Sequence, residues 1–521
     1  MSLIFYVLAS LVVLIKCESL PKPNIVFIVA DDLGWSDVSF HGSDQIMTPN
    51  IDMLAYQGII IPQYYTDTRG TPARSALFTG KYPLRMGTQG ISIASAEDRG
   101  LPTTEVLLPQ YLQELGYATH LIGKWGLGKS REHYLPTNRG FDTFYGFSGS
   151  SVDYYTYNHV ETWNETVFYG LDFFNNLEPV EDQRGHLTEV LTDRAVKLIR
   201  NHDTSVPLYL HMSHAAPHVG GGFVNLQTPE DLIAANDHIA HSPRRLYAGL
   251  VTGLDRSIGH VISALAEREL LNNTIVVLIS DNGAASTGLN RNFGSNLPLR
   301  AQKARLGKVR EGNYKIIIGK VEPQQSNYYG MELKKSRIPG FLYENVLLSS
   351  DTARVFRETL FINIDLEMAA TKRNYSDLYR HINNTDAERL CIPTNAKGCL
   401  FDLSVDPAES KDLWDTHPQF VQHMVLRLRA YWAAINPRQE PTLDPRANPA
   451  LHDFIWLPWL DNLENVSKPL LAIPNFPLQV SVGELQYLVD FNLNAFKESL
   501  TSYVKSSADS FIQNIAKLFS F

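Results

Sequence analysis

The sequence predicts an α/β protein, with a large, doubly wound mixed-sheet domain followed by a smaller C-terminal domain of sheet and helix. Two continuous apolar runs rich in β-branched residues, 24–30 and 274–280, are typical of strands buried on both faces of a parallel sheet. Stretches of helical periodicity lie between them, and alternating strands and helices favour the doubly wound arrangement. After Arg310 the pattern changes to shorter strands, which indicates the second domain.

The two apolar runs both end in acidic or amide residues. Asp31 and Asp32 follow the first run, and Asp281 and Asn282 follow the second. Ligands of open α/β sheets lie beyond the carboxyl ends of the strands, so both groups are expected at one site.

The other expected elements are two helices and a strand of the large domain, then two strands and a helix of the C-terminal domain. In that order they cover 104–115, 242–267, 207–213, 314–321, 400–403 and 418–435. The Pro-rich stretch 437–461 is expected to run over the surface.

The composition is that of an ordinary globular protein, with 44% hydrophobic and 19% charged residues among 521. The formal net charge of −9 offers no basic surface for nucleic acid. An acidic polymer would need a local positive pocket, because the overall field repels it.

The N-terminus carries an apolar run, Leu3–Ile15, followed by polar residues from Lys16. This length is typical of a cleaved signal peptide and short for a membrane span, although no positive side chain precedes it. An uncleaved signal anchor is the alternative. The leader predicts the secretory pathway, with a secreted or lysosomal destination, and five N-x-[ST] sequons favour the same route. The sequons are at Asn164, Asn272, Asn374, Asn383 and Asn465.

Two cysteines remain if Cys17 leaves with the signal peptide. Cys391 and Cys399 are eight positions apart, and in an oxidising compartment one small-loop disulfide is the simplest expectation. Two buried free thiols are the alternative. A zinc site is disfavoured because no further His or Cys nearby completes a tetrahedral set.

The C-terminal stretch 482–521 has apolar residues at helical spacing and predicts an amphipathic helical extension. It packs on its own domain or binds a partner; few basic residues on its polar face make a membrane role the weaker option. Four segments are therefore predicted: a signal peptide at 1–19, the large domain at 20–310, the C-terminal subdomain at 311–461 and the extension at 462–521.

The stretch from Thr68 to Lys81 resembles the sulfatase motif C-x-P-S-R-x-x-x-L-T-G-[RK], but Gly70 occupies the position of its cysteine. In that family the cysteine is oxidised to formylglycine, whose hydrated aldehyde attacks sulfur. The resemblance covers about residues 22–461, is nearest to arylsulfatase B-like enzymes and implies the alkaline phosphatase type of fold. Further motifs in family order are 24–34, 48–55, 123–125, 136–142 and 281–283.

The resemblance implies a calcium site. The family's metal ligands map onto Asp31, Asp32, Asp281 and Asn282, all oxygen donors of the kind that calcium prefers. Paired acids at one strand end also repel each other unless a cation lies between them. The alternative is that Asp31 and Asp32 only cap a turn.

A sulfate group is expected beside Gly70. Thr71 and Pro72 resemble the N-cap and first residue of a helix, whose free N–H groups attract an anion. The resemblance adds cationic or hydrogen-bonding side chains around the sulfate, namely Arg74, Lys124, His218 and Lys303. A sulfated small molecule or glycosaminoglycan is the implied ligand.

Two departures from the family weaken the prediction of an enzyme. Gly126 replaces the histidine that assists proton transfer in the family motif G-K-W-H-L-G. A stretch that the family has after the Lys303 motif is missing here, so the large domain is truncated or the gene model skips exons. The leading hypothesis is a pseudoenzyme that retains calcium and a sulfated ligand. The alternatives are an active arylsulfatase that uses a metal-bound water, and an interaction protein that acts through its C-terminal helix.

Overall fold

The computed structural model describes most of the chain from residue 21 to residue 461. The described ranges are 21–163, 166–286, 288, 290–299, 307–319, 340–378, 391, 393–394, 396–438 and 442–461. The predicted signal peptide and the predicted helical extension lie outside these residues, as does Lys303.

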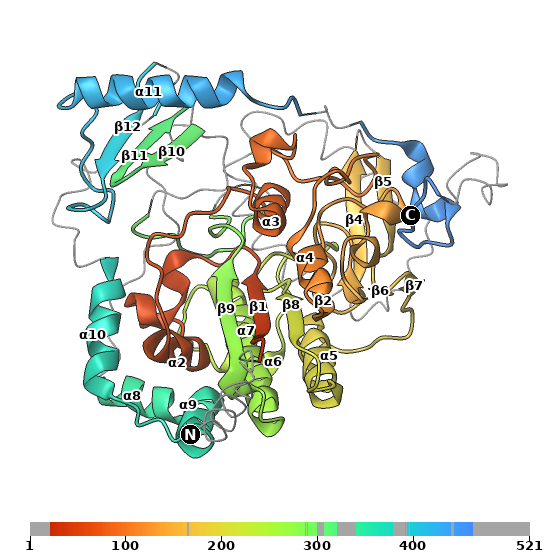
Figure 1. Cartoon of the computed structure of the whole chain (residues 1–521), viewed down its shortest axis with the longest axis horizontal. Coiled ribbons are helices and arrows are strands. Elements are labelled where there is room, and N and C mark those ends of the chain that lie inside the picture. Colours follow the sequence, from red (N-terminus) through yellow and green to blue (C-terminus); the bar gives the residue numbers. More distant parts are fainter. Residues whose placement is uncertain are drawn as a thin grey trace, which may run out of the picture. The chain divides into compact units, whose positions relative to one another are not determined.

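A seven-stranded mixed sheet forms the centre of the described chain, in the order β7-β6-β3-β2-β8-β1-β9 (Figure 1). The five strands from β3 to β9 in this order are parallel, and the short β6 and β7 are antiparallel. β9 forms one edge of the sheet within the described residues. The strand bounds are β1 Asn24–Ala30, β2 Ala118–Lys124, β3 Thr143–Phe147, β6 Phe174–Asn175, β7 Glu178–Pro179, β8 Leu208–Ser213 and β9 Thr274–Ser280.

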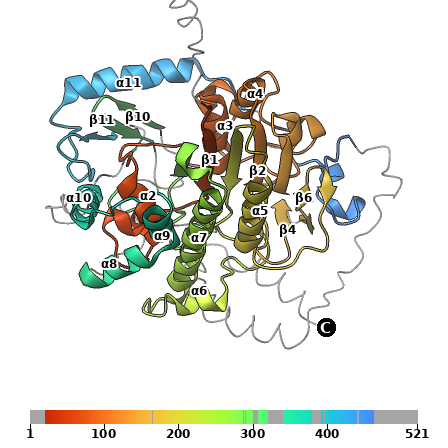
Figure 2. The ribbon, with the colours of Figure 1, turned by 60° about the horizontal axis from the view of Figure 1, so that its bottom comes forward.

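Helices cover both faces of this sheet, as Figure 2 shows for α5 and α7 on the face nearest the viewer. Alternate residues of β1 point to the two sides: Val26 and Ile28 enter the core under α2, α5 and α7, whereas Ile25 and Phe27 pack against the core under α3 and α4. The helix bounds are α2 Pro49–Gln57, α3 Gly70–Thr79, α4 Leu108–Glu114, α5 Leu187–Asn201 and α7 Ser242–Glu267.

Three helices that the sequence did not predict pack on the large domain: α8 (Gly340–Ser349), α9 (Asp351–Glu358) and α10 (Leu366–Ser376). Tyr343 of α8 donates a hydrogen bond to the buried carboxylate of Asp52 in α2, at 2.6 Å. α9 lies against α2 and α7. This part of the predicted C-terminal subdomain therefore shares the core of the large domain.

A smaller antiparallel sheet, β10-β11-β12, lies beside the long helix α11. A separate hairpin, β4-β5, pairs antiparallel next to the C-terminal part of the described chain. Their bounds are β10 Gly307–Glu311, β11 Tyr314–Ile318, β12 Cys399–Asp402, α11 Pro418–Ala433, β4 Asn158–Trp163 and β5 Thr166–Leu171. Short helices complete the described chain: α6 at 230–234 and single 3-10 turns at 35–37, 39–41, 83–85, 132–134, 136–138, 271–273, 445–447 and 449–451.

The predicted fold class, a large mixed sheet with helices and a smaller C-terminal sheet with a helix, is confirmed. The predicted strands 24–30 and 274–280 and the helix 242–267 have the expected bounds. The expected burial of 274–280 on both faces is wrong, because β9 is an edge strand among the described residues and its side chains are partly exposed. The helix expected at 104–115 is wrong at its start, because α4 begins at Leu108, directly before Pro109. Proline suits the first turn of a helix, where no N–H is needed.

Candidate functional site

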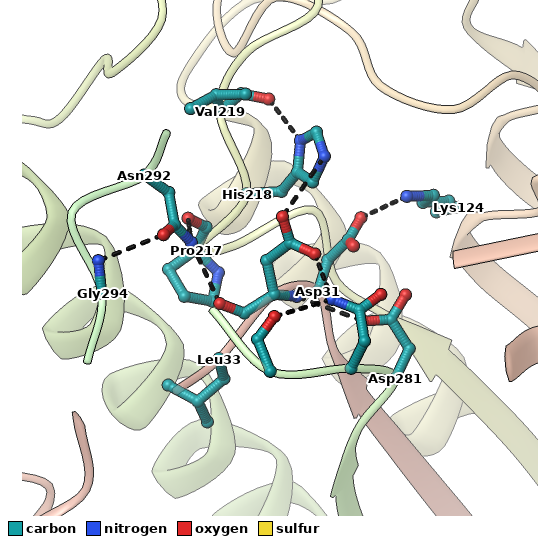
Figure 3. A network of polar contacts seen from close by, with 12 residues as sticks. Asp31, Leu33, Lys124, Pro217, His218, Val219, Asp281, Asn292 and Gly294 are labelled. Atoms are coloured by element: carbon teal, nitrogen blue, oxygen red, sulfur yellow. Dashed lines mark hydrogen bonds and ion pairs between the residues drawn. The ribbon is translucent and has the colours of Figure 1, made fainter. Parts of the chain in front are cut away.

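The acidic and amide residues at the strand ends lie together, as Figure 3 shows. Ala30 of β1 pairs with Ser280 of β9, so the residues that follow the two strands emerge side by side. The backbone N–H of Asp32 donates to Asp281 Oδ1 at 3.1 Å, and Asn282 donates its amide hydrogen to the carboxylate of Asp32. Asp31, Asp32, Asp281 and Asn282 are all buried.

Two buried basic side chains face these carboxylates. Lys124, at the end of β2, places Nζ 2.5 Å from Asp31 Oδ2. Arg74 of α3 places Nη2 3.0 Å from Asp281 Oδ2 and 3.8 Å from Asp31 Oδ2. Burial acts to raise the pKa of Asp31, but the positive charges of Lys124, His218 and Arg74 outweigh it and hold that pKa below its usual 3.8.

His218 approaches from the loop after β8. Its Nε2 lies 3.6 Å from Asp32 Oδ2, and its Nδ1 lies 2.6 Å from the carbonyl oxygen of Val219. Potential ligand atoms of Asp31, Asp32 and His218 all lie within 4.8 Å of one another. The structure therefore places this histidine beside the acidic group.

Gly70 is the first residue of α3 and is buried. The expected cap is wrong: Arg69, in an extended conformation, is the N-cap residue, and Pro72 lies inside the first turn. Thr71 does not cap because its hydroxyl donates to the carbonyl oxygen of Gly126 at 2.8 Å and accepts from the N–H of Ile93 at 3.1 Å.

A side chain at position 70 would face the meeting point of the acids and cations. A Cβ atom on Gly70 would lie 3.4 Å from Asp281 Oδ2, 3.5 Å from Lys124 Nζ and 3.9 Å from Arg74 Nε, which are ordinary contact distances. The backbone there therefore accepts a small side chain, and glycine leaves that space open.

Gly126 borders the same two basic side chains. Its Cβ position is 3.5 Å from Lys124 Cε and 3.7 Å from Arg74 Cδ. Its φ of 72° lies in the left-handed region, where a side chain is strained. Gly70 and Gly126 therefore both present only a hydrogen atom toward Lys124 and Arg74.

The donor set fits a hard cation. Asp31 Oδ1 and Asn282 Oδ1 are buried oxygen atoms without a hydrogen-bond partner among the described residues. Buried polar atoms are rarely left unpaired, and carboxylate and amide oxygens are calcium ligands. Three carboxylates, those of Asp31, Asp32 and Asp281, thus lie together at this place and offer further oxygen atoms to a cation.

Sequence reasoning missed two residues that hold this site together. The hydroxyl of Ser213 accepts a hydrogen bond from Arg74 Nη1, and Asn292 Nδ2 donates to the carbonyl oxygen of Asp32 at 3.0 Å. Ser213 ends β8, so the rule that ligands lie at strand ends could have identified it. Asn292 lies in an irregular loop without a sequence pattern that marks it.

Several predicted sites lie away from this group or outside the described residues. Cys391 and Cys399 form a disulfide, with their Cα atoms 6.1 Å apart. Asn272 and Asn374 are exposed sequon positions. The other three sequons, Asn164, Asn383 and Asn465, lie outside the described residues. No helix in the described part of the chain has the length and apolar character needed to cross a bilayer.

A comparison with protein families decides the affiliation of the chain. The sulfatase family model matches residues 23–355. The chain belongs to the sulfatase family. Over 497 residues, 84% of this chain and 80% of its relative, the protein is 31% identical to mouse arylsulfatase J.

Other sulfatases match over different lengths. Human steryl-sulfatase is 25% identical over 84% of this chain and 92% of its own length. Human N-acetylgalactosamine-6-sulfatase is 29% identical over 54% of each protein, so this match spans about half of both. The crystal structure of Ps i-CgsB superimposes with a TM-score of 0.55 at 23% identity, covering 80% of this chain and 94% of that one. The last similarity concerns the fold alone.

Proposed function

We propose that this protein is a secreted sulfatase-family pseudoenzyme that holds a calcium ion and binds sulfate esters without hydrolysing them. The observation that carries the proposal is Gly70, which stands where the family motif has its nucleophile and lies beside the buried side chains of Asp281, Lys124 and Arg74. Secretion rests on the leader and the sequons of the sequence.

Hydrolysis needs an atom that attacks sulfur and a group that handles the proton. Gly70 and Gly126 supply neither, and acid–base assistance alone is typically worth about 100- to 10,000-fold in rate. The hydroxyl groups of two residues near Arg74 already form hydrogen bonds with other groups. Thr71 bonds across to Gly126, and Ser213 bonds to Arg74.

Calcium would be held by Asp31, Asp32, Asp281 and Asn282, and when bound it would supply positive charge for an anionic oxygen. A divalent cation would add two positive charges to this group of side chains. The unpartnered oxygen atoms of Asp31 and Asn282 support this assignment.

A sulfate group would then lie against the start of α3. The free N–H groups of the first turn attract anions. Arg74 Nε is a buried donor without a hydrogen-bond partner among the described residues, and it lies 3.9 Å from the Cβ position of Gly70. The names of N-acetylgalactosamine-6-sulfatase and steryl-sulfatase indicate sulfate esters as the ligand class.

The test is turnover of 4-nitrocatechol sulfate by the purified full-length protein, with mouse arylsulfatase J measured in parallel. We expect no turnover above background, together with saturable binding of inorganic sulfate in the presence of calcium. Turnover comparable with that of the relative contradicts the proposal. Turnover that is lost in Asp281→Ala and unaffected by changes at Gly70 would instead favour hydrolysis by a metal-bound water.

A second arm examines the two glycines. Gly70→Cys alone should remain inactive even in cells that convert the cysteine, because position 126 still lacks a proton-transfer group. The double variant with Gly126→His is the matched comparison. Full activity of the single variant would show that Gly126 is irrelevant.

A further inference from the structure

One edge of the central sheet is long and apolar. Among the described residues, β1 is the only strand that pairs with β9, and the register between the two strands is unbroken from Thr274 to Ser280. The outer side of β9 therefore presents backbone N–H and C=O groups with which another strand can pair. Ile275, near the start of the strand, is 50% exposed, so apolar surface accompanies these groups.

Proteins usually protect a sheet edge with a charged side chain, a proline, a bulge or a very short strand. The opposite edge of the central sheet has such protection, because β7 consists only of Glu178 and Pro179. The edge strand β10 of the small sheet ends in Arg310 and Glu311. β9 contains no charged residue and no proline, and its unbroken register leaves no room for a bulge. Any protection of β9 therefore has to come from outside the strand.

A glycosylation sequon lies at the amino end of this strand. Asn272 belongs to the 3-10 turn directly before β9, and the hydroxyl residue of its sequon is Thr274, the first residue of the strand. Asn273 Nδ2 donates to the carbonyl oxygen of Lys22 at 3.1 Å, and Thr274 Oγ1 donates to that of Leu270 at 2.7 Å. These two bonds hold the neighbours of Asn272 against the protein, while Asn272 itself is exposed and accessible for a glycan.

We propose that a glycan on Asn272 covers the edge of β9 and prevents two copies of the protein from pairing through that strand. The inference rests on the secretory route of the proposed function, because the glycan is added there. A glycan is bulky and solubilising, so one attached two residues before the strand hinders the approach of a second strand.

The geometry of a symmetric pair strengthens this effect. Two β9 strands related by a two-fold axis pair antiparallel, so the amino end of each strand lies beside the carboxyl end of the other. Each Asn272 would then place its glycan against the second copy, and the pair would have to accommodate both glycans. The candidate site follows the carboxyl end of β9, at Asp281, so a glycan at the amino end leaves the site of its own copy open.

The experiment measures the mass of the full-length secreted protein in solution by sedimentation velocity, after peptide mapping of the glycan on Asn272. We expect the wild type to be monomeric. Asn272→Gln should form a dimer, with an affinity for itself at least about tenfold above that of the wild type. Ile275→Lys, added to this variant, should restore the monomer, because a charge on the exposed edge opposes pairing.

The matched control is Asn374→Gln, which removes an exposed sequon on α10 and should remain monomeric. A second route avoids any failure of Asn272→Gln to fold. An endoglycosidase that trims the glycans of the folded wild type to single sugars should also produce the dimer, and the same treatment of Ile275→Lys should not.

Four results would overturn this inference alone. They are a monomer for both Asn272→Gln and the trimmed wild type, equal dimerisation of Asn374→Gln, association that Ile275→Lys does not suppress, and a secreted protein whose Asn272 carries no glycan. A protein that stays in the cytosol without any glycan would overturn the secretory part of the proposed function as well.

Discussion

The two halves of the candidate site differ in the side chains that they carry. The half at the ends of β1 and β9 keeps every polar side chain: Asp31, Asp32, Asp281 and Asn282 are buried and connected by hydrogen bonds and ion pairs. The half at the start of α3 and the end of β2 has glycine at two positions, Gly70 and Gly126, that border the basic side chains. The basic residues Arg74 and Lys124 belong to both halves.

The difference teaches that, under the proposed function, charge recognition and bond cleavage belong to separate residues. Glycine at position 70 leaves a small space and no unpaired charge. Replacing a carboxylate would leave Arg74 or Lys124 buried without its partner, which costs far more free energy. The stability of the fold therefore depends more on the half with the carboxylates than on the half with the glycines.

The largest expected effect comes from removing a carboxylate from the acidic group at the ends of β1 and β9. Asp281→Ala should lower the free energy of unfolding by about 3–5 kcal/mol, because it leaves the buried Arg74 without its nearest carboxylate. Asp231→Ala, which removes an exposed partner of Arg256, is the control and should cost at most about 1 kcal/mol. Urea unfolding of both variants provides the values. Equal losses would contradict the comparison.

The next largest expected effect is the stabilisation of the folded protein by calcium. The ion should raise the free energy of unfolding by about 2.7 kcal/mol at a concentration one hundred times its Kd, because it binds only the folded site. Thermal unfolding with calcium and with a chelator measures this shift. Gly70→Ala should retain the shift, since the ligands belong to the other half. An identical Tm in both conditions would argue against the calcium assignment.

Between pH 7 and pH 5, stability should depend on the buried histidine His211 and not on the carboxylate of Asp31. Burial, with a smaller contribution from Arg74, lowers the pKa of His211 to about 3, so this side chain stays neutral in the folded protein. The unfolded chain takes up the proton below about pH 6.5, and His211 should therefore contribute a loss of stability of about 1–2 kcal/mol between pH 7 and pH 5. Asp31, whose pKa is held low, adds nothing in this window.

The variant for this pH test is His211→Phe, which keeps the ring stacking on Phe27. Its free energy of unfolding should depend less on pH between 7 and 5 than that of the wild type. Unfolding curves at both pH values check this. An unchanged pH dependence in the variant would remove His211 from the explanation.

The smallest expected effect is the difference in stability between alanine variants of the two glycines. Gly126→Ala should destabilise the fold by about 1 kcal/mol, because φ is 72° at that position. Gly70→Ala should change stability by no more than about 0.5 kcal/mol, since its Cβ meets only ordinary contacts at the start of a helix. Differential scanning calorimetry can resolve this pair. A larger cost at Gly70 would show that the space there is not open.

The fold could be predicted where one sequence pattern alone decides an element. The apolar runs of β1 and β9 and the long periodic stretch of α7 gave correct bounds because each is an unbroken pattern along the whole element, although the residues of β9 are only partly buried. α8, α9 and α10 could not be predicted in this way. They are positioned by distant partners, such as Tyr343 on Asp52 and Thr352 on Asn50, that no local pattern reveals.

The candidate site shows the same limit. The acidic residues could be found because they follow apolar strands, and Arg74 and Lys124 because they lie in motifs that resemble a family. The cap of α3 was misplaced because Thr71 has a partner in another loop, at Gly126. Asn292 could not be found, since its contact with Asp32 depends on how an irregular loop folds back.

The two ends of the central sheet have consequences for self-association. Within the described residues, one end is closed by the two-residue strands β6 and β7, which offer little backbone for pairing. The other end is β9, seven residues long and apolar, with Ile275 half exposed. Among the described residues, β9 is therefore the one long edge that the central sheet offers for backbone pairing. Two copies that paired through β9 would use this edge in both, so the central sheets would form a closed pair and would not continue into a filament.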